Sequence, residues 1–460
     1  MFKFMQKNFL CSAFVIFLSF FSVYISPNVL YISYIAFFLF LIRKKDTLFS
    51  IFLLMLFSVV LPNNFVSIIT SLIYGAYKFI RSKKSLNIFF NNANFFIFFI
   101  MLDVFFSCIL NKIQSVNFFF SLIFYLPVLI LLFDKKIFSE KNKLNIIYSL
   151  KIILQIEIIT TVFRFFKYGI NADEFNDWST GTFGEGQQVQ LCLIMLLFII
   201  HILFHKEFYK KKYYIYLLLS SIVVISTNSW SILFSSIFVI VLFCGISVTT
   251  SRLTLKRILL FFSVIIIIIF IPNLFPSSIV NMTIHMSNNS SYLLDKFAKV
   301  KVYYDTFVAI PSNDIMFFLF GNGLGNYCSR AALTCSGYYS DIYNSFFSPT
   351  SSLYMQEYIL PKLKNSYLFP ESDFGSILYR PYSTILAITG EFGIIGLLLC
   401  FLVCLIKYLR SNNYIRLAIL IFVSACFFEN FLEYSKIIII LGILVNLELK
   451  RPNVKNLMRI

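Results

Sequence analysis

Residues 8–25 read NFLCSAFVIFLSFFSVYI, a run without any charged side chain. Ser26-Pro27-Asn28 interrupts this run, and a second apolar run continues to residue 42. An α-helix needs about 20 apolar residues to cross a bilayer. Because a second run follows at once, we interpret residues 8–25 as a first membrane span rather than as a cleavable signal peptide.

The same apolar character extends through all 460 residues. Hydrophobic types make up 59% and charged types 13% of the chain, and the mean hydropathy is +0.83. Soluble domains average about 45–50% apolar and about 25% charged residues. These values exclude an ordinary soluble enzyme, a disordered chain and a coiled coil. We therefore predict an all-α, polytopic integral membrane protein.

The apolar runs predict about 14 transmembrane helices, in a range of about 12–14. The spans are residues 8–25, 28–42, 48–61, 65–78, 88–110, 117–133, 144–166, 188–205, 213–227, 230–247, 258–273, 382–406, 417–431 and 437–448. Residues 1–273 then hold about 11 spans, and residues 382–460 hold about three spans and a cytoplasmic tail. Residues 274–381 form a polar segment without a span. Connections longer than about 15 residues are usually functional, so we expect this large extracytoplasmic loop to be functional.

The formal net charge of +18 follows this topology. Lys and Arg concentrate in alternate connections, and the short connections of the other side hold only Lys112, Lys167 and Lys436. Basic residues near span ends stay in the cytoplasm. We therefore predict a multi-pass protein of the bacterial inner (plasma) membrane with both termini in the cytoplasm. Since topology explains the charge, we expect the lipid bilayer and no nucleic acid as a partner.

Charged side chains inside predicted spans are functional candidates, because burying them in a bilayer is costly. They are Asp103, Glu157, Arg164, Glu391 and Glu429. Glu157 and Arg164 are two helical turns apart and share one helix face. For Asp103, a hydrogen bond between helices is the structural alternative.

The outer connection after Arg164 also carries candidates. Lys167 follows Arg164, and then come Asp177, a glycine-rich turn and Glu185, just before the helix that starts near residue 188. The N-terminus of that helix points outward and favours anions. The alternative is a solvated loop without a specific role.

In the long outer loop, residues 317–327 read FFLFGNGLGNY. Gly321, Gly323 and Gly325 resemble a phosphate-binding turn, but their spacing does not fit a dinucleotide-binding fingerprint. Such a turn could bring backbone amides close to a phosphate. Arg330 and Arg380 could bind a diphosphate with two nitrogens each, although a surface ion pair is an equal alternative for each arginine.

Two cysteines of this loop, Cys328 and Cys335, could form a disulfide in an oxidising compartment. We see no metal site in the sequence. His201 and His205 have the spacing of metal ligands on a helix, but they lack further ligands nearby.

At these residues the chain resembles bacterial O-antigen polymerases (Wzy), in the superfamily shared with O-antigen ligases. The layout of many spans with one dominant late outer loop is similar. So are the segment DWSTGTFG at 177–184, the segment FGNGLG at 320–325 and the segment STILAITGEFGIIG at 383–396.

The resemblance implies a membrane glycosyltransferase that joins undecaprenyl-diphosphate-linked oligosaccharide repeat units. It implies no cofactor, because the donor is already activated. Cations at Arg164, Arg330 and Arg380 would stabilise the leaving diphosphate. A general base would be Asp177, Glu185 or Glu391. A chain-length regulator and a flippase are implied partners.

Two alternatives stay open. A ligase would transfer finished polysaccharide to an acceptor, but ligases typically carry a His-Asn pair where this chain has Tyr382-Ser383. A flippase for the same lipid-linked sugars would line a central cavity with charges and would not need the large outer loop.

Overall fold

A computed structural model describes residues 8–42, 47–81, 115–132, 140–169, 179–183, 187–204, 213–227, 229–248, 298–337, 348–363 and 383–446. Within these ranges the protein is helical and has no strand, which confirms the all-α prediction. The predicted spans 88–110 and 258–273 lie outside the described residues.

Every other predicted span overlaps a helix. These are α2 (Asn8–Tyr24), α3 (Asn28–Ile42), α4 (Thr47–Phe57), α5 (Asn64–Arg81), α7 (Ser115–Leu132), α8 (Glu140–Arg164), α9 (Gln188–Phe204), α11 (Tyr213–Ser226), α12 (Trp230–Val248), α22 (Thr384–Arg410), α23 (Asn413–Ala425) and α24 (Ser435–Asn446). Among the described residues, two helical stretches, Asn142–Tyr168 and Thr384–Leu409, are long and apolar enough to span a membrane, and the other apolar helices are shorter. The number of spans thus stays a prediction.

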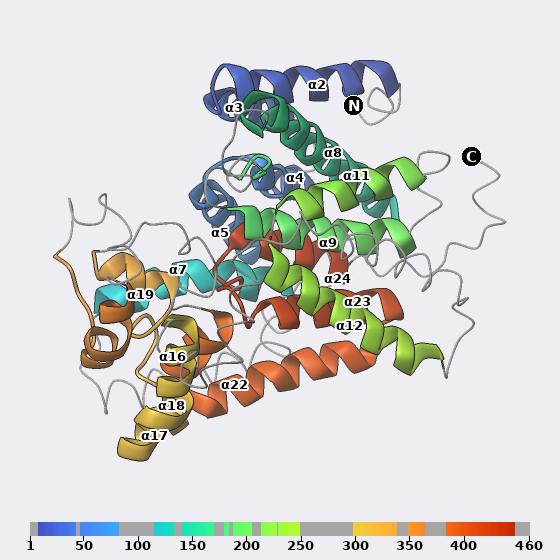
Figure 1. Cartoon of the computed structure of the whole chain (residues 1–460). Coiled ribbons are helices and arrows are strands. Elements are labelled where there is room, and N and C mark those ends of the chain that lie inside the picture. The colour runs from blue at the N-terminus through green and yellow to red at the C-terminus, as the bar shows by residue number, and fades with distance from the viewer. Residues whose placement is uncertain are drawn as a thin grey trace.

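Helix α24 lies in the interior of the helix bundle, where it contacts α4, α5, α7, α9 and α23. Figure 1 shows α2 and α3 at one edge of the bundle, α22 at the opposite edge and α24 between them. Apolar side chains from these helices form one large buried core. The residues at the start of α24 are therefore surrounded by protein on several sides.

The outer faces of the peripheral helices are also apolar. Only 17% of the most apolar window of α22 is buried, and Leu398 and Leu409 are each 61% exposed. Helices α2, α3 and α11 expose large apolar side chains in the same way, such as Phe14, Ile32 and Leu218. A monomer in water rarely exposes an apolar surface of this extent.

Short helices from the predicted outer loop gather at one end of the bundle, beside the start of α22 (Figure 1). They are α16 (Ala298–Tyr304), η5 (Asp305–Ala309), α17 (Ile310–Asn313), α18 (Ile315–Phe320), α19 (Arg330–Cys335) and η6 (Met355–Ile359). We call this part, residues 298–363 as far as described, the outer cap. It packs around a second core of its own.

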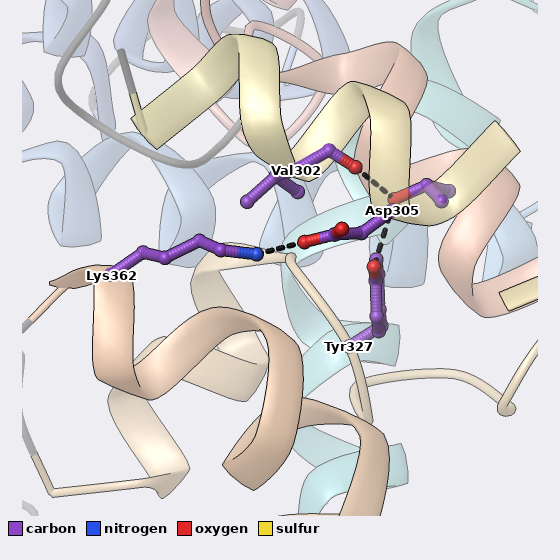
Figure 2. A network of polar contacts seen from close by, with 5 residues as sticks. Val302, Asp305, Tyr327 and Lys362 are labelled. Atoms are coloured by element: carbon purple, nitrogen blue, oxygen red, sulfur yellow. Dashed lines mark hydrogen bonds and ion pairs between the residues drawn. The ribbon is translucent and has the colours of Figure 1, made fainter. Parts of the chain in front are cut away.

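A polar network joins three parts of the outer cap (Figure 2). Lys362 forms an ion pair with Asp305. The adjacent Thr306 hydroxyl lies 2.7 Å from the Val302 carbonyl oxygen and 2.8 Å from the Tyr327 hydroxyl. The network fixes the stretch that contains the glycine-rich turn against η5.

Candidate functional site

The glycine-rich turn of the outer cap packs against a break in α22. Gly321, Gly323 and Gly325 all have positive φ angles, of 75°, 86° and 78°. The amide of Asn322 donates to the carbonyl of Gly390 at 2.8 Å. The Gly323 amide donates to the carbonyl of Glu391 at 3.0 Å. These two amides are used within the protein and do not face outward.

Close backbone contact explains why glycine occupies these positions. A Cβ atom at Gly321 would lie 2.4 Å from the backbone carbon of Glu391, and one at Gly325 would lie 2.4 Å from the Asn117 carbonyl oxygen. In α22, Gly393 has φ 68° and ψ −174°, so the helix is interrupted there. The turn and the break thus fit each other, and they hold Glu391 at the junction.

Two carboxylates lie at this junction. Glu391 and Glu433 are both fully buried, and they interact electrostatically. Glu433 lies in the connection between α23 and α24, where its carboxylate accepts hydrogen bonds from the Arg330 amide and, at 2.6 Å, from Asn430. Burial raises the pKa of the Glu433 carboxyl to about 7, although these hydrogen bonds and the charge of Arg330 oppose the shift.

Arg330 begins α19 on the same side of the bundle. Its guanidinium carbon lies 3.9 Å from the centre of the Tyr434 ring, within the range of a cation–π contact. Its charge also acts on Lys436, one helical position into α24.

Lys436 is 1% exposed and lies against the connection between α4 and α5. Its ammonium group donates to the Leu61 carbonyl and, at 3.3 Å, to the Pro62 carbonyl. It also lies 4.4 Å from the centre of the Phe183 ring. Lys436 interacts electrostatically with Glu157 on α8.

Glu157 and Arg164 organise the segment 179–183, part of the predicted glycine-rich turn after α8. The Glu157 carboxylate accepts hydrogen bonds from the Thr182 amide at 2.9 Å and from the Thr182 hydroxyl. Arg164 donates to the Thr180 hydroxyl at 2.8 Å. Gly181 between them has φ 56°, and a Cβ there would lie 2.3 Å from the Glu157 carboxylate. The turn therefore covers the carboxylate.

Together these side chains form what we call the buried charge string. Its members, linked in order by the electrostatic interactions above, are Arg164, Glu157, Lys436, Arg330, Glu433 and Glu391. The three carboxylates and Lys436 are buried and the two arginines are half-buried, so these charges interact more strongly than they would in water. Such a string can bind an anion through its cations and hold a proton on its carboxylates.

The structure brings four of the predicted candidates together in this string: Arg164, Glu157, Arg330 and Glu391. The Lys167 ammonium group is directed away from the string. It donates to the Val23 carbonyl at 2.6 Å and contacts the Tyr24 and Tyr168 rings.

Five other candidates lie apart from the string or outside the described residues. Asp103, Asp177, Glu185 and Arg380 lie outside the described residues. Glu429 is buried beside the string, and its carboxylate accepts from the Asn430 amide at 3.2 Å.

The predicted disulfide is not present, because Cys328 and Cys335 are separately buried thiols. Cys335 is the last residue of α19, and Cys328 lies two residues before Arg330, the first residue of that helix. At about 1.5 Å rise per residue, the five steps from Arg330 to Cys335 alone extend about 7.5 Å along the helix axis, whereas a disulfide needs a Cα–Cα distance below about 7 Å. Burial raises the pKa of the Cys328 thiol well above its usual value.

Sequence reasoning missed Glu433 and Lys436 as site residues. Lys436 was placed in a short outer connection and Glu433 was not singled out. A usable signal was present: Glu429, Glu433 and Lys436 fall within one short stretch between two apolar runs. Burying several charges beside two spans costs free energy unless each charge has a partner.

Comparison with protein-family models, curated proteins and solved structures gives no match for this chain. The functional interpretation therefore depends on the site itself.

Proposed function

We propose that this protein is a polymerase of the bacterial inner membrane. It joins undecaprenyl-diphosphate-linked oligosaccharide repeat units into O-antigen or capsular polysaccharide at the outer face of that membrane. The observation that carries the proposal is the buried charge string, which sets three cations beside three carboxylates next to the outer cap. Diphosphate is an anion that such cations stabilise.

The exposed apolar faces support the membrane part of the proposal. Side chains such as Leu398 on α22 and Leu218 on α11 face outward and are more than half exposed. Lipid tails would cover these faces in a bilayer. The proposed orientation follows from the distribution of Lys and Arg along the chain.

In this orientation the charge string lies at the outer side. Helix α8 runs outward and ends at Arg164, while α22 and α24 run inward and carry Glu391 and Lys436 near their beginnings. Arg330 belongs to the outer cap. Four separate parts of the chain thus contribute charges to the same side, where the lipid-linked substrate would be.

The proposed reaction has one bond made and one bond broken. A hydroxyl oxygen of the incoming repeat unit attacks the anomeric carbon of the growing chain, and the bond from this carbon to the lipid diphosphate breaks. Arg164, Arg330 and Lys436 would stabilise the diphosphate as it leaves, with Arg380 as a further candidate. Glu391 would accept the hydroxyl proton, with Asp177 and Glu185 as alternative bases. The donor is activated, so neither ATP nor a nucleotide sugar is needed.

Deletion of the gene tests the proposal directly. Electrophoresis of surface polysaccharide should show loss of the long ladder while a single repeat unit is still attached to its acceptor. Loss of all attached sugar with accumulation of lipid-linked polymer would instead indicate a ligase. Loss of the ladder and of the single attached unit, without lipid-linked polymer, would indicate a flippase for the same sugars. An unchanged ladder would reject all three functions.

Point variants then test the site. Arg164→Ala and Arg330→Ala should each reduce the amount of polymer while the protein level stays normal. Arg164→Lys and Arg330→Lys should restore only part of the polymer, because a single ammonium group replaces a guanidinium that donates from two nitrogens. Arg416 is a matched control, since its guanidinium donates to the carbonyls of Tyr408 and Leu409 at the end of α22 that is cytoplasmic in the proposed orientation. Arg416→Ala should keep the ladder. Full activity of both string variants would remove the string from the reaction.

A further inference from the structure

The first part of α22 is covered by protein, and the outer cap contributes to that cover. Every residue from Thr384 to Glu391 is buried, whereas the exposed apolar face of the helix begins at Leu398. Helix α18 of the cap packs against α22, with the Leu319 carbonyl next to Gly393. Figure 1 shows α17 and α18 beside the start of α22, at the edge of the bundle that α22 forms. At this level the cap therefore forms part of the outer surface beside α22.

Helix α18 is itself apolar and partly exposed. All six of its residues, Ile315–Phe320, are apolar. Ile315 is 57% exposed and Met316 is 42% exposed. Val308 of η5, which also contacts α22, is 50% exposed. Neighbouring exposed apolar side chains of this size are unusual on a solvated segment and point to a surface that something apolar covers.

The charges of α22 give the depth of α18 in a bilayer. In the proposed orientation α22 runs inward, and Lys407 is the first charged residue after Glu391. At about 1.5 Å rise per residue, Gly393 lies about 21 Å outward of Lys407, within a hydrocarbon core about 30 Å thick. Ile315 is one helical turn before Leu319, so even an α18 directed straight outward places Ile315 only about 6 Å further out. Helix α18 therefore lies at the depth of the outer-leaflet acyl chains.

We propose that α18 is immersed in the outer leaflet, where acyl chains contact Ile315, Met316 and the neighbouring Val308. The inference rests on the membrane orientation given with the proposed function. Continuity of the surface favours lipid as the occupant. Lipid covers the exposed faces of α18 and α22 without a break, whereas a partner protein on α18 alone leaves the face of α22 uncovered.

Immersion of α18 also has a consequence for the candidate site. Phe320 ends α18, and Gly321 begins the glycine-rich turn directly after it. The turn packs on the carbonyls of Gly390 and Glu391. An α18 held by lipid thus fixes the junction at the membrane surface, where the diphosphate of a lipid-linked substrate lies.

Quenching of tryptophan fluorescence by lipid tests the inference without any assay of polymer. Ile315→Trp is compared with Leu402→Trp, a lipid-facing control on α22, and with Gln356→Trp, a control at an exposed polar position of the outer cap. Subtraction of the wild-type emission removes the signal of Trp178 and Trp230. Each full-length variant is reconstituted in phosphatidylcholine vesicles with and without bromine on the upper part of the acyl chains, because bromine quenches the tryptophans that it contacts.

Brominated lipid should lower the added emission of Ile315→Trp about as strongly as that of Leu402→Trp, and several-fold more than that of Gln356→Trp. Iodide on both sides of the bilayer should give the reverse order. Quenching of Ile315→Trp by iodide alone, with Leu402→Trp quenched by lipid, would overturn the inference and leave the proposed function intact. If lipid quenches neither position, the membrane orientation of the proposed function fails as well. Protection of Ile315→Trp from both quenchers would also overturn the inference, since a second copy of the chain or another protein would then cover α18.

The wild-type protein decides the question if Ile315→Trp does not fold. Phosphatidylcholine with a photoactivatable diazirine on its acyl chain should label the tryptic peptide 302–330, which contains α18, and fragmentation should place the label within residues 308–316. Absence of label from this peptide in a sample whose α22 is labelled would overturn the inference.

Discussion

Substitution of Gly393 by alanine probes the contact on which the site depends. The φ and ψ angles of Gly393, 68° and −174°, fall in a region that is essentially restricted to glycine. An alanine Cβ would also lie 2.1 Å from the Leu319 carbonyl oxygen and 2.3 Å from its carbon. The backbone strain costs about 1–3 kcal/mol. Overpacking against a fixed backbone costs about 1–3 kcal/mol more. We therefore expect a loss of about 2–6 kcal/mol, out of the ~5–15 kcal/mol typical of folded proteins.

The measurement is the apparent unfolding temperature of the full-length protein in detergent, at one fixed heating rate. Gly75→Ala is the matched control, because Gly75 lies inside α5, is half-buried and has no positive φ angle. Alanine in an ordinary helical position is neutral or stabilising by up to about 1 kcal/mol. We expect Gly393→Ala to unfold several degrees below the wild type and Gly75→Ala to unfold near it. Equal unfolding temperatures for the two variants would refute the packing of the glycine-rich turn against the break in α22.

Two further predictions concern the outer cap and the charge string. Asp314 caps α18 by accepting from the amides of Met316 and Phe317 at 2.9 and 3.1 Å, so Asp314→Ala should cost about 1–2 kcal/mol at neutral pH, measured as a lower unfolding temperature. Burial acts to raise the pKa of Asp314, but hydrogen bonds from Tyr354 and these amides outweigh it and lower the pKa, so the difference from the wild type should disappear as the pH falls below about 3.9 and through the folded pKa. In the string, Lys436→Met should cost about 3–5 kcal/mol because it leaves the buried Glu157 without this cation. Addition of Glu157→Gln should recover part of that loss, and a double variant less stable than the sum of the two single variants predicts would contradict the pairing.

The helices were largely predictable from the sequence. Residues 28–42 were predicted as one span and form α3 over the same range, and the span 188–205 differs from α9 by one residue. Long uncharged runs leave the backbone little alternative to a helix, because its amides and carbonyls must be satisfied within the run. Polar residues such as Asn28 and Gln188 then mark where the runs begin.

The break in α22 could not be predicted in the same way. Gly393 lies inside an uninterrupted apolar run, and glycine is common in membrane helices. What makes the break is a contact with Leu319, which is far away in the sequence. For the same reason the turn at Gly321 suggested a phosphate site, whereas the Gly323 amide is used by a carbonyl of α22. Local sequence shows that a glycine permits an unusual backbone, but not which partner requires it.

Four members of the candidate site, namely Arg164, Arg330, Glu157 and Glu391, were predictable from the sequence, whereas Glu433 and Lys436 were not. Arg164 and Arg330 stood out as arginines beside outer segments, while Glu433 and Lys436 looked like charges of a short connection. Their importance follows from energetics. Lys436 is buried and the two arginines are half-buried, so little water screens their action on an anion. The burial of each cation is tolerable only if a carboxylate balances it. Glu157 beside Lys436 and Glu433 beside Arg330 fulfil that condition, so the acids are as necessary to the site as the cations that would bind a substrate.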